Sequence, residues 1–96
     1  MIVSFNDKRT EDLFHGKQSA NRRKLPRDIQ DAALRKLDML NAVSSLTDLN
    51  SPPSNHLESM KGDLRGRYSI RINNQWRLLF RFEGSNAYDV EIIDYH

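Results

Sequence analysis

The second half of the chain alternates between apolar and polar residues with a period of two. Three segments show this alternation, at positions 68–72, 76–82 and 88–93. Successive side chains of a strand point to opposite faces of a sheet, so each segment predicts a strand with one apolar face. Short polar turns separate them, which favours an antiparallel meander. The positions expected in the core are Tyr68, Ile70, Ile72, Trp76, Leu78, Phe80, Phe82, Tyr88, Val90 and Ile92.

The first half of the chain carries a helical pattern instead. In the stretch PRDIQDAALRKLDMLNAV, the residues Ile29, Ala33, Leu37 and Leu40 recur at the spacing of one helix face. Pro26 stands where a first helical residue tolerates a missing N–H. We therefore predict a long amphipathic helix whose apolar stripe lies on the sheet.

A shorter helix is expected in the stretch NDKRTEDLFHGK. Asn6 or Asp7 is the candidate N-cap and Gly16 the C-terminal stop. The apolar run Ile2–Phe5 before it is interpreted as a first strand. The pattern as a whole predicts an α+β fold with one domain over residues 1–96, which suits the size of a single hydrophobic core.

The strand register follows from parity. Only loops with an odd number of residues bring all the apolar faces to one side, because side chains alternate along each strand. This predicts a three-residue loop in the first hairpin and the loop 83–87 in the second. Arg81 would then lie across from Asp89, and Leu79 across from Glu91. One face carries the core and the helices, and the other is expected to be polar, rich in arginine and open to solvent.

Composition narrows the class of protein. The 96 residues include 29% charged and 38% apolar side chains and no cysteine. Disulfides and cysteine-based zinc sites are therefore excluded, and we expect a reducing, cytoplasmic environment. No apolar run approaches the roughly 18 residues of a membrane span, and no signal-peptide pattern opens the chain. We expect neither a membrane association nor a cofactor.

The charges are segregated although the net charge is only +2. Positions 61–81 carry six cations against Asp63 alone, whereas positions 83–94 carry four acids and no cation. Forked guanidinium groups match phosphate oxygens, so the cationic segment predicts a phosphate-binding track. The alternative is a solvated face whose arginines pair with nearby acids. The candidate phosphate-binding residues are Lys61, Arg65, Arg67, Arg71, Arg77 and Arg81.

The chain ends in three side chains that can handle protons: Asp94, Tyr95 and His96. An imidazole exchanges protons near neutral pH. We expect the carboxylate of Asp94, two residues earlier, to orient the imidazole of His96. His56 and Glu58 lie upstream, two residues apart. A metal site that uses these residues is disfavoured, because no compact spacing of ligands supports it.

The segment LESMKGDLRGRYSIRINNQWRLLFRFEG, followed by AYDVEIIDYH, resembles the HigB-type toxins of the RelE superfamily. The similarity covers essentially the whole chain. Its specific parts are the Lys61-Gly62-Asp63 step, the Trp76-Arg77 pair and the terminal Asp94-Tyr95-His96. The resemblance implies a small domain with a curved antiparallel sheet backed by helices.

The same resemblance implies a function. Members of this family are ribosome-dependent endoribonucleases that cut messenger RNA in the A site and halt translation, without a metal. A HigA-type helix-turn-helix antitoxin neutralises them, and the complex represses its own operon by binding operator DNA. Residue by residue, the similarity implies catalytic roles for Asp94, Tyr95, His96 and Arg77, together with Lys61.

One position departs from the pattern of the best-known members. Those carry a catalytic histidine three residues before the Lys-Gly step, where this chain has Glu58, as another branch of the family does. Glu58 is therefore the candidate general base. Two alternatives stay open from the sequence: an RNA- or ribosome-binding module that blocks translation without cleavage, and a domain that only binds a protein partner.

Overall fold

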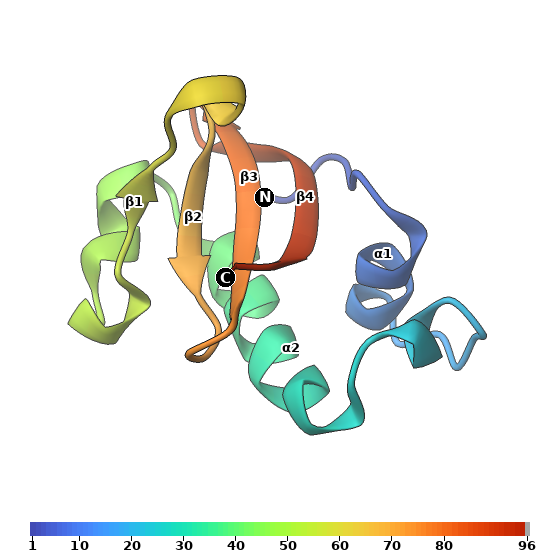
Figure 1. Cartoon of the computed structure of the whole chain (residues 1–96). Helices are drawn as coiled ribbons and strands as arrows, with labels where there is room; N and C mark the ends of the chain where they lie inside the picture. The colour runs from blue at the N-terminus through green and yellow to red at the C-terminus, as the bar shows by residue number, and fades with distance from the viewer. Residues whose placement is uncertain (96) are drawn as a thin grey trace.

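The computed structural model describes residues 1–95, and the chain forms an α+β fold in which two helices pack against a four-stranded antiparallel sheet. The strand order is β1-β2-β3-β4, and α2 crosses behind the sheet while α1 lies beside β4 (Figure 1). The helices are α1 (Lys8–Phe14) and α2 (Arg27–Ala42), and the strands are β1 (Glu58–Ser59), β2 (Tyr68–Arg71), β3 (Trp76–Glu83) and β4 (Asn86–Asp94). The connections contain 3₁₀ turns at Arg22–Lys24, Leu46–Asn50, Pro53–Asn55 and Gly62–Leu64.

The ends of α1 follow the predicted signals. The Asp7 carboxylate accepts a hydrogen bond from the Thr10 backbone N–H at 2.9 Å, which satisfies one of the free donors at the helix start. His15 ends the helix, and Gly16 follows with φ of +74°, the left-handed conformation that glycine adopts at little cost. Both the N-cap and the stop signal were therefore interpreted correctly.

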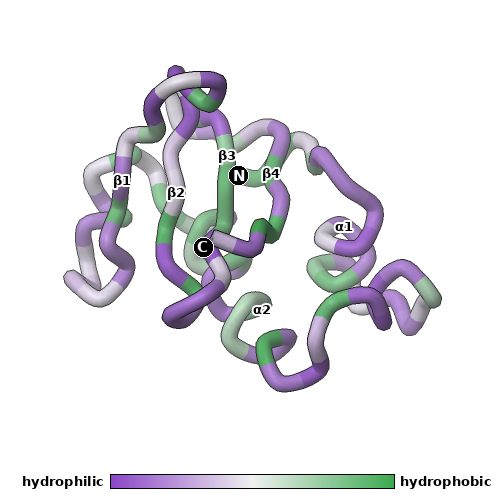
Figure 2. The backbone as a smooth tube through the Cα atoms, in the orientation of Figure 1, coloured by the Kyte–Doolittle hydropathy of each residue, from purple (hydrophilic) through white to green (hydrophobic). Residues whose placement is uncertain are grey.

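The long helix α2 also matches its prediction. Pro26 is the residue that precedes its first turn, and Ile29, Ala33, Leu37 and Leu40 are all buried. These four side chains join the same core cluster as the inner face of the sheet. Figure 2 shows this as hydrophobic segments of α2 and the central strands, with hydrophilic loops outside. Among the described residues, no helix is long and apolar enough to cross a membrane.

The core face of the sheet agrees with the period-two pattern at most positions. Ile70, Leu78, Phe80, Val90 and Ile92 are fully inaccessible to solvent. Burying a large aliphatic or aromatic side chain contributes about 1.5–3 kcal/mol. The strand residues therefore stabilise the fold together with core residues of the helices, such as Leu37 and Leu40. The α+β class predicted from the sequence is confirmed.

The first hairpin has the predicted register. Arg71 lies across from Arg77, and the Ile72 N–H donates to the Trp76 carbonyl at 2.9 Å, which leaves a loop of the three residues Asn73–Gln75.

The second hairpin differs from the prediction. Its strands pair up to Glu83 and Asn86, so the turn holds two residues and not five. Asp89 then forms a β-bulge with φ of +53°, and beyond it Leu79 pairs with Glu91 as predicted. An even turn plus one extra residue in β4 gives the same parity as an odd loop, so the sequence pattern alone could not distinguish the two solutions.

The bulge corrects two expectations. Arg81 lies across from Tyr88 and not from Asp89. Tyr88 consequently belongs to the polar face, where the Arg81 guanidinium stands 4.6 Å from the centre of its ring. The prediction that Tyr88 faces the core was wrong because the extra residue inverts the alternation at that end of β4.

The N-terminal segment is not a full strand. Ile2 and Phe5 form two isolated parallel bridges with Ala87 and Val90 at the outer edge of β4. The fourth strand of the sheet is instead β1, which pairs antiparallel with β2 at the opposite edge. A strand of two residues is too short to produce a recognisable alternation, which explains why the sequence did not indicate it.

Candidate active site

The centre of the second sheet face is covered and not open to solvent as predicted. Ser69 and Leu79 on this face are 0% and 2% exposed, and Arg77 is 6% exposed. The chain from β1 onward lies across them: Met60 is buried, and its sulfur accepts a hydrogen bond from the Ser69 hydroxyl at 3.3 Å. This segment therefore covers the centre of the sheet face and, with Tyr95, borders a groove.

Arg77 is held beneath this segment by hydrogen bonds to uncharged acceptors. Its Nε donates to Ser69 Oγ at 2.8 Å, and its Nη2 donates to the carbonyl oxygens of Ser69, at 3.2 Å, and of His56. The Arg77 guanidinium also lies 5.4 Å from the centre of the Tyr95 ring. No carboxylate among residues 1–95 forms an ion pair with Arg77. Its charge therefore remains available to an anion.

The groove itself has a volume of about 620 Å³. It is lined by Glu58, Ser59, Met60, Lys61, Leu64 and Tyr95. Tyr95 is 46% exposed, and its backbone N–H donates to the Gln75 carbonyl at 2.7 Å, which holds this end of the chain beside the first hairpin. Three predicted site residues, Glu58, Lys61 and Tyr95, thus share one groove, and the Tyr95 ring connects it to Arg77.

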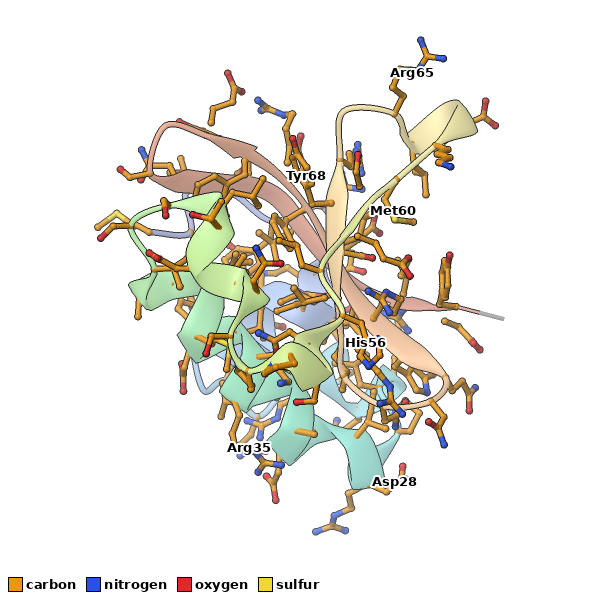
Figure 3. All side chains as sticks on the ribbon, turned by 90° about the vertical axis from the view of Figure 1, so that its left-hand side faces the viewer. Asp28, Arg35, His56, Met60, Arg65 and Tyr68 are labelled. Atoms are coloured by element: carbon orange, nitrogen blue, oxygen red, sulfur yellow. The ribbon has the colours of Figure 1, made fainter. Side chains whose placement is uncertain are left out.

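The loop after β1 carries two exposed cations, Lys61 and Arg65. Figure 3 shows the segment that crosses the sheet face, with His56 and Met60 against the sheet and Arg65 projecting into solvent. Neither cation forms an ion pair with any of the described residues. Gly62 has φ of +64°, so the turn that presents Lys61 needs a residue that tolerates the left-handed region.

Arg71 stands at the first hairpin, directly across from Arg77. Its Nε donates to the Asn73 carbonyl at 3.2 Å, and its Nη2 donates to the Asn74 side chain. Two facing arginines repel each other. Because the acceptors of both are neutral, this part of the face keeps a concentrated positive charge.

Arg67 and Arg81 have different surroundings. Arg67 forms an ion pair with Glu91 at 3.6 Å. Arg81 forms ion pairs with Asp89, at 3.4 Å, and with Glu83. The alternative derived from charge alone, arginines paired with nearby acids, therefore holds for two of the six predicted phosphate-binding residues.

The end of the chain is only partly described. Asp94 lies across from Trp76 and accepts a hydrogen bond from the Gln75 side chain at 3.1 Å. His96 lies outside the described residues, so the predicted Asp94–His96 contact and the side of the sheet on which His96 lies stay predictions. Residues 1–95 contain no group of three or more potential metal ligands.

Ser69 and the backbone of His56 were not predicted as parts of the site. Both act through groups that carry little signal in a sequence: a small hydroxyl within a strand and a carbonyl oxygen. His56 has φ of +45°, a conformation uncommon outside glycine, and in it the His56 carbonyl accepts the Arg77 hydrogen bond. The one available signal was that a serine alternates with arginine on the polar side of β2.

Comparison with known proteins identifies the family. The model described as "RelE-like toxin of type II toxin-antitoxin system HigB" matches residues 3–96. The chain belongs to the HigB-like toxins. Among curated relatives, Toxin HigB-1 of Vibrio cholerae is 38% identical over 82 residues, which cover 85% of this chain and 84% of that protein. Endoribonuclease HigB of Proteus vulgaris is 29% identical over the full length of both proteins.

Solved structures give the same fold for this HigB-like toxin. The chain aligns with the YoeB–YefM toxin–antitoxin complex of Staphylococcus aureus with a TM-score of 0.54, 19% identity and coverage of 100% of this chain and 98% of that one. The YoeB/ParE toxin of Agrobacterium tumefaciens gives a TM-score of 0.51 at 18% identity, with 99% and 96% coverage. The resemblance to HigB-type toxins inferred from the sequence is confirmed, and membership of a toxin–antitoxin family implies an antitoxin partner.

Proposed function

We propose that this HigB-like toxin is an endoribonuclease that cuts messenger RNA in the ribosomal A site and so inhibits translation. The observation that carries the proposal is the Arg77 guanidinium, which is held by neutral acceptors and lies 5.4 Å from the centre of the ring of Tyr95, one of the residues that line the groove together with Glu58 and Lys61. The name of the Proteus vulgaris relative, Endoribonuclease HigB, supports the same activity.

The reaction needs no nucleophile from the protein. The 2′-oxygen of the substrate attacks the adjacent phosphorus, the bond to the 5′-oxygen breaks, and a 2′,3′-cyclic phosphate forms. A base takes the proton of the 2′-hydroxyl, and an acid protonates the leaving oxygen. Each proton transfer contributes about 10²–10⁴-fold to the rate, and a fixed donor that faces the developing charge contributes a comparable factor.

We assign the proton transfers to Glu58 and His96, with Asp94 orienting His96. Glu58 is exposed at the rim of the groove, where a carboxylate has access to a hydroxyl of bound RNA. The roles of Asp94 and His96 rest on the resemblance of the last three residues to the family pattern. No metal has a part in this mechanism.

The phosphate would be bound by Arg77, assisted by Arg71 and Lys61. Arg65 lies in the same exposed loop as Lys61 and projects into solvent (Figure 3), so it would contact a phosphate further along the RNA. Arg67 and Arg81 belong to the sequence-based phosphate-binding set, but their carboxylate partners weigh against a large contribution. Tyr95, an exposed ring beside the groove, would stack on a base or donate a hydrogen bond to the substrate.

The shape of the groove is consistent with dependence on the ribosome. The residues that line its rim are largely exposed, so free RNA would be poorly oriented there. A ribosome that presents the message would supply that orientation as a high effective concentration. The protein would then act in the cytoplasm, where translation takes place.

The antitoxin is proposed to be a HigA-type helix-turn-helix protein, and operator DNA would be contacted through the complex. A candidate docking surface is the basic segment 17–27. It borders a hollow of about 790 Å³ formed with the start of α2, at the other end of the molecule from β1 (Figure 1). Because this surface lies away from the groove, a complex of this kind would leave the groove uncovered.

An in vitro translation assay tests the activity. A reporter message is translated with the purified protein, and its new 5′ ends are mapped. We expect cuts in register with the codons, abolished by His96→Gln. His15→Gln at the C-terminal cap of α1 is the matched control and should cut like the parent protein, because His15 is exposed and does not line the groove.

Two results would contradict the proposal. If His96→Gln cuts as well as the parent protein, the assignment of His96 is wrong. If ribosomes stall on a message that stays intact, the protein is a binding module and not a nuclease.

A further inference from the structure

We infer that Ser69 is a positioning residue whose hydroxyl fixes the orientation of the Arg77 guanidinium for phosphate binding. The inference rests on the proposed function, because it assigns Arg77 and the neighbouring groove, which Tyr95 lines, to RNA. Ser69 is fully buried, so it would not contact the RNA and would act only through Arg77.

The first support is the hydrogen-bond geometry. Ser69 supplies two acceptors to one guanidinium: its hydroxyl oxygen accepts from Nε at 2.8 Å, and its carbonyl oxygen accepts from Nη2 at 3.2 Å. The His56 carbonyl accepts a further bond from Nη2. A guanidinium has five N–H bonds in a fixed plane. Within residues 1–95, nothing accepts from Nη1, so the two N–H bonds of that nitrogen are left for a ligand.

The second support is the environment of the hydroxyl. Ser69 is 0% exposed, so no water competes for its oxygen. Its own proton has an acceptor in the Met60 sulfur at 3.3 Å. Because the hydroxyl donates to Met60, its lone pairs are free to face Arg77 Nε. The hydrogen bonds that connect Met60, Ser69 and Arg77 therefore fix both the orientation of the Ser69 hydroxyl and the plane of the Arg77 guanidinium.

The third support is a comparison with the other arginines of this face. Arg67 and Arg81 are oriented by carboxylates, which also neutralise them. Ser69 orients Arg77 without adding a negative charge. A neutral positioning group is what a phosphate-binding arginine requires, since a carboxylate in the same place would compete with the ligand.

The main experiment is a double-mutant cycle of Ser69→Ala and Arg77→Lys in single-turnover cleavage on ribosomes. Lysine cannot make the Nε contact. We expect Ser69→Ala to lower the cleavage rate constant about tenfold with little change in the concentration for half-saturation, the size expected for loss of one charge-assisted hydrogen bond. In the Arg77→Lys background, Ser69→Ala should change the rate less than twofold, because the partner is already absent.

A spectroscopic measurement gives a readout that does not depend on activity. The Arg77 side-chain Nε–H should exchange slowly with solvent in the parent protein and at least about tenfold faster in Ser69→Ala, since its acceptor is lost. Ser69→Thr keeps the hydroxyl and should retain slow exchange and most of the cleavage rate. Ser69→Cys keeps the size but is a weak acceptor and should behave like Ser69→Ala.

The outcomes separate two failures. If Arg77→Lys lowers cleavage strongly and Ser69→Ala does not, or if Ser69→Ala has the same effect in both backgrounds, the positioning role is wrong while the nuclease proposal stands. If the parent protein does not cut, or Arg77→Lys cuts normally, the proposed function fails. In that case the exchange measurement still reports whether Ser69 orients Arg77.

Discussion

The two ends of one sheet face use the same residue type for opposite purposes. At the end near the first hairpin, Arg77 and Arg71 donate to hydroxyl, amide and carbonyl oxygens. We call this the groove end. At the end near the second hairpin, Arg67 and Arg81 donate to carboxylates. We call this the paired end.

The difference teaches that the position of an arginine says less about its role than the charge of its acceptors. Partly exposed ion pairs like those of the paired end contribute about 0–1 kcal/mol each, and they cancel the field that would attract an anion. The neutral acceptors of Arg77 immobilise the side chain and leave its charge intact. A phosphate would therefore bind at the groove end and be poorly attracted to the paired end.

The largest expected effect comes from the centre of the groove end. Arg77→Lys keeps the charge but loses the planar fork, and we expect it to lower single-turnover cleavage about 10²–10³-fold. Arg81→Lys at the paired end is the matched control and should stay within about twofold. The measurement is the rate constant at which each variant cleaves a ribosome-bound message at the mapped positions. Equal losses in the two variants would erase the distinction between the two ends.

The next effect concerns the carboxylates. Glu58→Gln should lower the cleavage rate about 10²-fold at neutral pH, because the amide cannot accept the proton of the 2′-hydroxyl. Glu83→Gln, which removes an acid of the paired end, should leave the rate unchanged. Full activity of Glu58→Gln would move the general base to another residue.

A smaller effect is expected from the aromatic rings. Tyr95→Ala should raise the concentration for half-saturation about tenfold, since stacking on one base contributes about 1–3 kcal/mol, and Tyr95→Phe should be nearly normal. Tyr88→Ala removes the ring beneath Arg81 and should not weaken RNA binding. If Tyr95→Phe is as defective as Tyr95→Ala, the hydroxyl and not the ring face is the functional group.

The smallest effect is a gain. Asp89→Asn combined with Glu91→Gln removes two acids of the paired end, and asparagine tolerates the left-handed conformation at position 89. Arg67 loses its carboxylate partner and Arg81 keeps only Glu83, so the two arginines should raise the affinity for single-stranded RNA about threefold at low salt, as measured by fluorescence anisotropy. The gain should disappear at high ionic strength. If the affinity for RNA does not rise at any salt concentration, the ion pairs with carboxylates are not the reason that the paired end binds RNA weakly.

The periodicity of apolar residues predicted most of the fold, because the apolar side chains on one face of each strand and helix are the ones that are buried in the core. Ile70, Leu78 and Phe80 had to face the core, and Ile29 and Leu37 had to meet them. The turn of the second hairpin could not be predicted, because a bulge changes parity without changing composition. The structure brings the predicted side chains Glu58, Lys61 and Tyr95 to one groove, whereas the burial of Arg77 was not predicted.

The depth of the site depends on the segment from His56 to Met60. Only Met60 in it is a buried apolar side chain that contacts the polar face, and β1 is too short to show a pattern. The burial of Arg77 is therefore a property of tertiary packing, which the local sequence did not reveal.

Both margins of the sheet are closed to strand addition. On one side β1 offers only two residues. On the other, the outer edge of β4 is engaged by the opening residues, with Val3 N–H donating to the Ala87 carbonyl at 2.8 Å and Asn6 N–H to the Val90 carbonyl at 2.9 Å. Proteins with blunted edges resist templated self-assembly. We therefore expect the toxin not to aggregate through its sheet when it is released from its antitoxin. A protein partner would bind to its side chains and would not add a strand to the sheet.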